Sequence, residues 1–87
     1  MSDTPTVNDL AAELLAFVGR EIITDRDDLA TGTDLLAAGF DSFSLVNVLL
    51  YIEKQYGIWV PETAFTEQSL QNTQTLAATI QPHLHAR

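Results

Sequence analysis

Apolar residues recur at helical spacing in three segments of the chain, and the first lies near the amino terminus. Between residues 7 and 22 they follow one another mostly three or four positions apart, which is the period of a helix with one buried face. The apolar positions are Val7, Leu10, Leu14, Phe17, Val18 and Ile22. Thr6 or Asn8 can cap the start, and Gly19 leaves the helix end between residues 18 and 23.

The second segment predicts a helix over residues 42–56. Its apolar stripe advances by four, three and four residues, through Leu45, Leu49, Ile52 and Tyr56. Gly57 follows, and glycine readily adopts the left-handed conformation with which helices often end. Beyond it, alternation along the chain directs Ile58 and Val60 inward and Trp59 outward.

The third segment predicts a helix that is capped by Asn72 or Thr73 and ends before Pro82. Its inner face consists of Leu76, Ala77 and Ile80. Between this helix and the second, residues 62–66 leave room for one short turn or helix.

A polar, acid-rich connection of about eighteen residues, 24–41, separates the first two helices. Connections of this length are unusual in a compact domain and indicate either a missed element or a functional loop. Its apolar anchors are Leu29, Leu35, Leu36 and Phe40. Thr33 or Asp34 can cap a short turn over residues 35–38.

Together these elements predict an all-α fold, a small bundle of three principal helices plus one short helix. A chain of 87 residues has room for one modest hydrophobic core. We therefore expect a single domain over residues 1–87, with an ordered core over about 7–81 and flexible tails at 1–5 and 82–87.

Charge restricts the partners of this domain. Twelve acidic and four basic residues give a net charge of −8, which repels nucleic acid and anionic lipid. Basic or apolar protein surfaces are the expected partners, although net negative charge also serves solubility alone.

The apolar stretches are only a few residues long and predict no membrane span. No export signal is evident at the amino terminus, and a cytoplasmic location is expected.

Residue patterns typical of catalysis and of metal binding are missing from the sequence. The chain has no cysteine, so any thiol chemistry must come from an attached group. The only histidines, His83 and His85, lie beyond Pro82 and are not expected to serve a serine nucleophile or a metal ion. No enzyme activity, catalytic residue or metal site is predicted.

Asp41 and Ser42 stand where the second helix begins. A helix start exposes unpaired backbone N–H groups and the positive end of the helix dipole, which favour an anion such as a phosphate ester. Ser42 is therefore the candidate for a residue that carries one. Serine and aspartate are also common helix caps, and the pair taken alone favours that structural interpretation.

The residues around Asp41 and Ser42 favour the functional interpretation over the cap. Ser42 lies within Leu35-Leu36-x-x-Gly39-x-Asp41-Ser42, and the helix is followed by Gly57-Ile58-x-Val60-Pro61-Glu62. These motifs resemble an acyl carrier protein over residues 10–80, and most specifically over 39–61. The resemblance implies that Ser42, in Asp41-Ser42-Phe43 where the family has Asp-Ser-Leu, is esterified with 4′-phosphopantetheine. The terminal thiol of that group holds an acyl or aminoacyl cargo as a thioester.

The resemblance also implies that partner enzymes dock on the second helix. These partners are a phosphopantetheinyl transferase, an acyltransferase or adenylating ligase, and a ketosynthase or condensation-type enzyme. The matching docking positions are Asp41, Phe43, Val46, Asn47, Leu50 and Glu53. Phe43, Leu50 and Tyr51 form an apolar docking patch, or else Phe43 and Tyr51 close the edge of the bundle. Trp59 is a further partner contact or lies flat against its own bundle, and the two outcomes are equally expected.

The type of carrier is indicated by the charges on the second helix. Fatty-acid carriers typically have acids where this chain has Ser44, Asn47, Lys54 and Gln55. This difference argues against fatty-acid synthesis and favours a carrier of polyketide or nonribosomal-peptide-type natural-product biosynthesis. Met1 and the short tails favour a free-standing protein, and a monomer is expected. The alternatives are a D-alanyl-type carrier and an acidic helical interaction module that is never modified.

Overall fold

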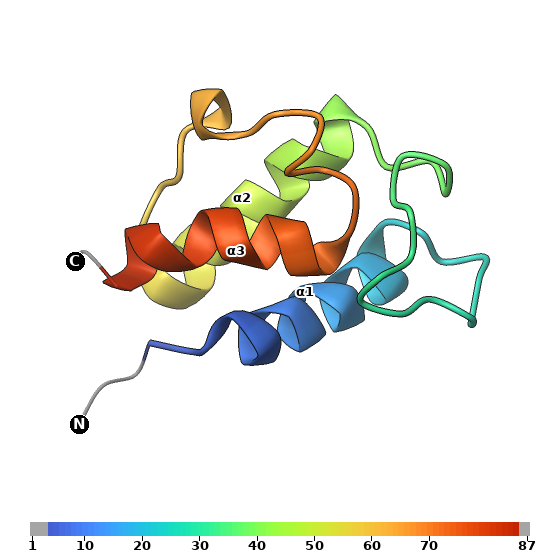
Figure 1. Cartoon of the computed structure of the whole chain (residues 1–87), viewed down its shortest axis with the longest axis horizontal. Coiled ribbons are helices and arrows are strands. Elements are labelled where there is room, and N and C mark those ends of the chain that lie inside the picture. Colours follow the sequence, from blue (N-terminus) through green and yellow to red (C-terminus); the bar gives the residue numbers. More distant parts are fainter. Residues whose placement is uncertain (1–3, 86–87) are drawn as a thin grey trace.

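The computed structural model describes residues 4–85, and its regular structure is helical throughout (Figure 1). The α-helices are α1 (Val7–Glu21), α2 (Ser42–Tyr56) and α3 (Thr73–His85), and a short 3-10 helix, η1 (Glu62–Ala64), lies in the connection between α2 and α3. The predicted all-α bundle of three principal helices and one short helix is confirmed. Within residues 4–85, no helix is long and apolar enough to cross a membrane.

The core lies where the three helices meet. Figure 1 shows α1 and α3 side by side, with α2 crossing behind α3, and α1 packs mainly against α3. The helices and the loops both contribute fully buried side chains, among them Leu10, Leu14, Val18, Leu35, Val48, Leu49, Ile52, Val60, Leu76 and Ile80. Burial of these side chains is the main favourable term in folding for a domain of this size.

The first two helices begin and end as their sequences predict. Thr6 caps α1, because its hydroxyl oxygen accepts a hydrogen bond from the Asp9 N–H at 3.1 Å. The α1 helix ends at Glu21, inside the expected interval. The α2 helix spans the predicted residues 42–56, and Gly57 follows it in the left-handed conformation with φ 71°. After Gly57, the predicted alternation also holds: Val60 is buried and Trp59 is 46% exposed.

The start of α3 is confirmed, with Asn72 as its cap. The side-chain oxygen of Asn72 accepts a hydrogen bond from the Thr75 N–H at 2.8 Å, and the Thr75 hydroxyl oxygen accepts one from the Asn72 N–H at 3.1 Å. This reciprocal pair satisfies two backbone donors that a helix start otherwise leaves unpaired.

The predicted end of α3 before Pro82 is wrong. The helix runs through Pro82 to His85. Proline has no N–H to donate to the carbonyl four residues earlier, but its fixed φ is compatible with a helix. The next turn is held by the core, because Leu84 is only 1% exposed. Residues 82–85 are therefore helical rather than a tail, while residues 1–3 and 86–87 of the expected tails lie outside the described part of the chain.

The long connection between α1 and α2 contains one capped turn. The Asp34 side chain accepts a hydrogen bond from the Ala37 N–H at 3.2 Å, and Gly39 leaves the turn with φ 104°. Leu35 and Phe40 are buried as expected, but Leu36 is 45% exposed. The prediction that Leu36 is a core anchor is wrong, because a single turn directs only one side toward the core and Leu35 and Phe40 occupy it.

Backbone hydrogen bonds fasten this connection to the beginning of α3. The Leu35 N–H donates to the Gln71 carbonyl at 2.7 Å, and the Thr31 carbonyl accepts from the Gln74 N–H at 3.3 Å. The Thr73 hydroxyl also donates to the Thr31 carbonyl, at 3.4 Å. These hydrogen bonds hold the connection that leads into α2 against the beginning of α3, although the two segments are far apart in the sequence.

Candidate functional site

Ser42 is the first residue of α2 and is exposed. The helix cap is the preceding residue, Asp41, whose Oδ1 accepts hydrogen bonds from the Ser44 N–H and the Ser44 hydroxyl, each at 3.0 Å. The Ser42 hydroxyl makes no hydrogen bond to any residue in the range 4–85. Asp41 therefore provides the helix cap, and the Ser42 hydroxyl remains available for modification.

The Asp41 carboxylate is held in its ionised form by the start of the helix. The Ser44 N–H, followed by the Ser44 hydroxyl, lowers the pKa of Asp41 below its ordinary value. A carboxylate with a lowered pKa is a poor proton acceptor, and this one already serves as the cap. Asp41 consequently positions the first turn of α2 and is not suited to activate the Ser42 hydroxyl as a general base.

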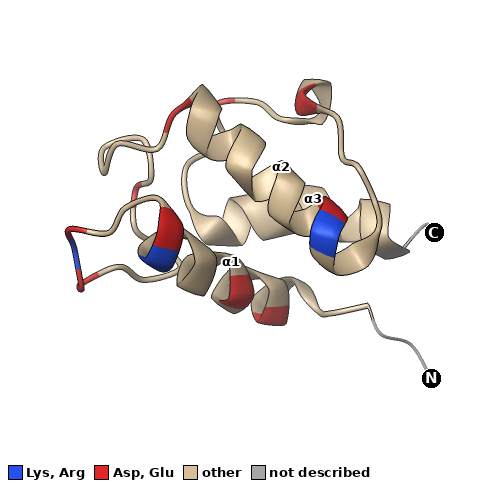
Figure 2. Ribbon diagram, turned by 180° about the vertical axis from the view of Figure 1, so that it is seen from behind, with Lys and Arg blue, Asp and Glu red and all other residues tan. Residues whose placement is uncertain are grey.

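The surroundings of Ser42 fit a phosphate ester. The residue sits at the positive end of the α2 dipole, and Figure 2 shows that the charged residues of α2 lie only near its carboxyl-terminal end. Those charged residues are Glu53 and Lys54. A phosphate on Ser42 would therefore meet no acid from α2 itself apart from the capping Asp41 before it.

The predicted docking positions lie mostly on the surface. Phe43 is 83% exposed and Leu50 is 50% exposed. Asn47 and Glu53 are also exposed, whereas Val46 is half-buried. These residues and Trp59 are available to a partner to different degrees, with Phe43 the most accessible apolar side chain among them.

Tyr51 does not belong to the exposed patch that the sequence suggested. Its ring stacks on Phe17 of α1 with centroids 4.5 Å apart, and its hydroxyl donates to the carboxylate of Glu13. Tyr56 donates to the other oxygen of the same carboxylate. Glu13, Tyr51 and Tyr56 form a polar clamp between α1 and α2, so Tyr51 joins the two helices and closes the bundle edge.

The histidines lie far from Ser42. Figures 1 and 2 both place the carboxyl-terminal end of α3, which contains His83, at the opposite end of the molecule from the first turn of α2. No group of three or more His, Cys, Asp or Glu side chains in the described part of the chain is arranged to hold a metal ion.

Comparison with known proteins shows the family to which the chain belongs. A sequence model described as a phosphopantetheine attachment site matches residues 12–80 of the chain. The chain belongs to the phosphopantetheine-dependent carrier protein family. This carrier is also 31% identical, over 74 residues, to a protein named "Aminoacyl carrier protein" from Agrobacterium fabrum (strain C58 / ATCC 33970). The alignment covers 85% of the carrier and 88% of that relative. No solved structure matches the carrier.

Family membership confirms the acyl-carrier resemblance and the cofactor. Carriers of this family hold 4′-phosphopantetheine covalently on a serine, and they are tethers rather than enzymes. They interact with phosphopantetheinyl transferases and with biosynthetic enzymes. The match covers three of the chain's serines, Ser42, Ser44 and Ser69, and the structure distinguishes among them.

Proposed function

We propose that Ser42 is the attachment serine of this carrier. The observation that supports it is the free, exposed Ser42 hydroxyl beside a helix cap that another residue provides. Ser44 is only 6% exposed and its hydroxyl donates to Asp41. Ser69 is half-buried, and its hydroxyl lies 3.3 Å from that of Thr66. Ser42 is thus the most exposed of the three serines, and its hydroxyl has no hydrogen-bond partner among residues 4–85.

The chain contributes an acceptor hydroxyl and a rigid helix start to the modification. The Ser42 oxygen loses its proton and forms the bond to phosphorus, while the adenosine bisphosphate portion of coenzyme A leaves. A base for this step has to come from the transferase, because Asp41 is committed to the cap. Once attached, 4′-phosphopantetheine supplies the thiol that the cysteine-free chain lacks.

The test is an intact-mass measurement after incubation with coenzyme A and a promiscuous phosphopantetheinyl transferase. The unaltered protein should gain one phosphopantetheine, and Ser42→Ala should gain none. Ser44→Ala and Ser69→Ala are matched controls that should still be modified. An unchanged mass of the unaltered protein, with a transferase that is active on another carrier, would support an unmodified interaction module and overturn the proposal.

The cargo that we propose is an acyl or aminoacyl group of a natural-product pathway of polyketide or nonribosomal-peptide type. Two observations support this class over fatty-acid synthesis. The Agrobacterium relative is named an aminoacyl carrier protein, and α2 carries a single acid, Glu53. A D-alanyl-type carrier is the competing assignment. Mass spectrometry of the carrier isolated from its source organism would distinguish an amino acid from an acyl chain on the thiol.

The proposed partners are a loading enzyme, either an acyltransferase or an adenylating ligase, and a ketosynthase or condensation-type enzyme. They would meet a monomeric carrier in the cytoplasm. Their docking surface would centre on Phe43 and Leu50, because these are the most exposed apolar side chains of α2. Asp41, Val46, Asn47, Glu53 and Trp59 complete it. Exposed aromatic and aliphatic residues of this kind are enriched where proteins meet.

A further inference from the structure

Ser44 is a buried polar residue two positions beyond the proposed attachment serine. It lies in the first turn of α2 and is only 6% exposed. Its backbone N–H and its hydroxyl both donate to Oδ1 of Asp41, each at 3.0 Å. The N–H bond is the ordinary bond of a helix cap, and any residue except proline could make it at this position. The hydroxyl bond is an addition that depends on the serine side chain.

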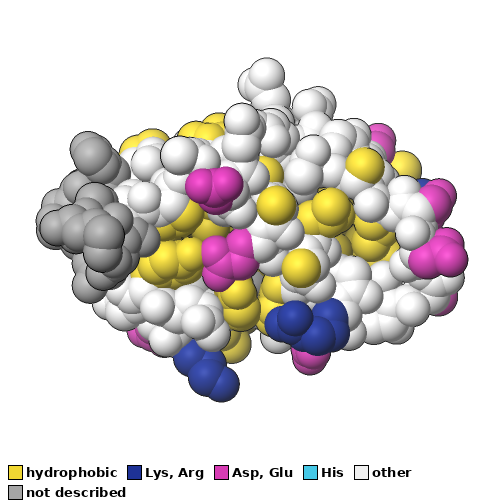
Figure 3. Space-filling view, turned by 90° about the horizontal axis from the view of Figure 1, so that it is seen from below, with side chains coloured by type: hydrophobic (Ala, Val, Ile, Leu, Met, Phe, Trp, Pro, Cys, Tyr) yellow, Lys and Arg dark blue, Asp and Glu magenta, His cyan; other side chains and the backbone are white. Residues whose placement is uncertain are grey.

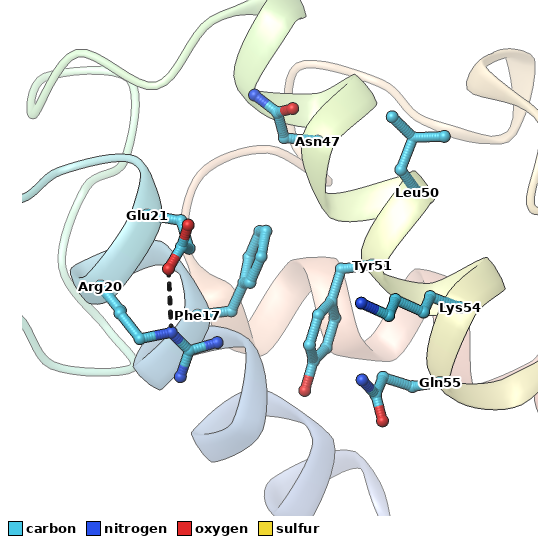
Figure 4. Close-up of a pocket in the computed structure, with 8 residues that line it drawn as sticks. All are labelled: Phe17, Arg20, Glu21, Asn47, Leu50, Tyr51, Lys54 and Gln55. Atoms are coloured by element: carbon cyan, nitrogen blue, oxygen red, sulfur yellow. Dashed lines mark hydrogen bonds and ion pairs between the residues drawn. The ribbon is translucent and has the colours of Figure 1, made fainter.

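No cation in the described part of the chain shares the charge of Asp41. The carboxylate makes no ion pair within residues 4–85. Arg20 and Lys54 line a groove between α1 and α2 (Figure 4), and Arg26 pairs within the connection after α1. Figure 3 views the molecule from the α1 side and shows basic side chains on that face. The two donors of Ser44 are therefore the main groups that stabilise the ionised Asp41.

The first turn of α2 has two possible caps that differ by one residue. Asp41 is the cap in this structure, with extended backbone at φ −133° and ψ −168°, and Ser42 is the first helical residue. If α2 began one residue later, the Ser42 hydroxyl would instead accept a hydrogen bond from the N–H of Ser44 or Leu45. Aspartate and serine are about equally good caps. The preference of the cap residue alone does not decide between the two starts.

The Ser44 hydroxyl favours the start that the structure has. Its bond requires the Asp41 side chain to lie over the first turn, as it does when Asp41 is the cap. Because the acceptor is charged, this bond is stronger than one between neutral groups. With Asp41 held as the cap, the Ser42 hydroxyl makes no hydrogen bond to any residue in the range 4–85.

We propose that Ser44 is a positioning residue for the attachment of phosphopantetheine, because its hydroxyl selects Asp41 rather than Ser42 as the helix cap. The selected start keeps the Ser42 oxygen available to the transferase, whereas the later start engages that oxygen in the cap. The donors of Ser44 also draw charge from the carboxylate beside which the phosphate ester forms. This inference rests on the proposed attachment at Ser42 and adds the residue that maintains it.

The kinetic test compares Ser44→Ala with Ser44→Thr in the transferase reaction with coenzyme A, followed by intact mass over time. Ser44→Ala retains the N–H bond and lacks the hydroxyl, so the two caps become about equal and about half of the molecules have the competent start. The KM for the carrier should therefore rise about twofold, while kcat and the final mass should be those of the unaltered protein. Ser44→Thr retains a hydroxyl and should restore the KM.

Carbon chemical shifts of Ser42 report the choice of cap directly. In the unaltered protein its Cα and Cβ shifts should be those of a helical residue. In Ser44→Ala they should move about halfway toward the values of an extended residue, and in Ser44→Thr they should stay helical. Loss of packing at Ser44, without a change of cap, would move neither these shifts nor the KM of the folded protein.

Tyr51→Phe is the matched control, because it removes a hydroxyl that donates to a carboxylate elsewhere on α2. Figure 4 shows the Tyr51 side chain directed from α2 toward α1, where its acceptor is Glu13. The variant should be less stable than the unaltered protein but should keep the same Ser42 shifts and the same KM. Urea unfolding of every variant establishes the conditions under which all of them are folded.

Three results would overturn the inference and leave attachment at Ser42 intact. They are an unchanged KM in Ser44→Ala, helical Ser42 shifts in that variant, and a rise in KM that Ser44→Thr does not reverse. Absence of any modification in the unaltered protein would instead refute the proposed function. The Ser42 shifts need no transferase, so they still show in that case whether Ser44 selects the cap.

Discussion

The two ends of α2 are held in different ways. At its beginning, the helix is secured by the Asp41 cap and presents Ser42 and Phe43 to solvent. In its second half, Tyr51 and Tyr56 both donate hydrogen bonds to Glu13 of α1, and Tyr51 also stacks on Phe17. One end thus offers exposed groups to other molecules, and the other joins the helices of the bundle. Substitutions at the two ends should therefore separate function from stability.

The largest effect on function is expected from Phe43→Asp. This substitution should slow cargo loading about thirtyfold, since a central aromatic contact at an interface often contributes about 2 kcal/mol or more. The melting temperature should hardly change, because Phe43 is 83% exposed. Loading kinetics and thermal unfolding are measured on the same sample. Leu50→Glu should act in the same direction, and loss of its cooperative melting transition would instead show that Leu50 is needed by the core.

The largest effect on stability is expected from Glu13→Ala. It removes the acceptor of both tyrosine hydroxyls and should lower the free energy of unfolding by about 1–3 kcal/mol, the usual cost when buried or charge-assisted hydrogen bonds lose a partner. Urea denaturation measures this change. Glu21→Ala is the control, because its ion pair with Arg20 is exposed and should contribute little. Equal losses in the two variants would contradict the clamp.

Attachment of phosphopantetheine should not depend on the clamp that Glu13, Tyr51 and Tyr56 form. Glu13→Ala should still receive phosphopantetheine on Ser42 at the rate of the unaltered protein, under conditions where both remain folded. The reason is that the Asp41 cap and the connection fastened to α3 hold the beginning of α2 independently of Glu13. A matching loss of modification would show that the two ends of α2 are coupled.

The clamp also predicts a dependence of stability on alkaline pH. Burial, and then the hydrogen bond to the Glu13 carboxylate, raises the pKa of Tyr51 from 10.0 to about 12. The same causes raise the pKa of Tyr56. Because the folded state favours the neutral phenols, their contribution is fully present below pH 10 and is lost as the pH rises through 12. Urea unfolding between pH 8 and 12 should show this decline.

The double variant Tyr51→Phe, Tyr56→Phe provides the control for the pH experiment. It should be less stable than the unaltered protein at pH 8, because the hydrogen bonds to Glu13 are gone. Its stability should depend less on pH between 10 and 12, since neither phenol remains to ionise. If the free energy of unfolding of this variant falls with pH as steeply as that of the unaltered protein, the alkaline decline comes from other groups.

The regions that the sequence predicted correctly are those controlled by local signals. The bounds of α2 follow from an aspartate cap, an apolar stripe and Gly57, all within a few residues of the helix. Ser42 is proposed on a local signal of the same kind, the spaced motif around it, and its role stays a prediction. Its freedom from the cap was not predictable, since Asp41 and Ser42 are both good caps and only the structure shows which one is used.

The errors concern residues whose surroundings come from distant parts of the chain. The sequence predicts that α3 ends before Pro82, but the buried Leu84 continues α3 against the core. The sequence leaves Tyr51 either in an exposed patch or at the edge of the bundle, and only the bond to Glu13, 38 positions earlier, shows that the second position is the right one.

The smallest expected effect is spectroscopic and concerns Trp59, which follows α2 and belongs to neither the cap nor the clamp. Trp59 is 46% exposed, while Val60 beside it is buried. As the only tryptophan, it should emit at long wavelength and be quenched readily by iodide in the free carrier. Trp59→Phe should leave the stability almost unchanged, because substitutions of partly exposed residues usually cost about 0.5 kcal/mol or less.

Addition of the loading enzyme decides whether Trp59 extends the docking surface. If the partner covers Phe43, Leu50 and Trp59 together, the emission should shift to the blue and iodide quenching should fall on binding. A loading enzyme without its own tryptophan near the interface, or a carrier labelled with 5-fluorotryptophan and observed by ¹⁹F NMR, keeps the signal specific. An unchanged signal in a complex that Phe43→Asp weakens would confine docking to α2 and leave Trp59 as a side chain that covers its own bundle.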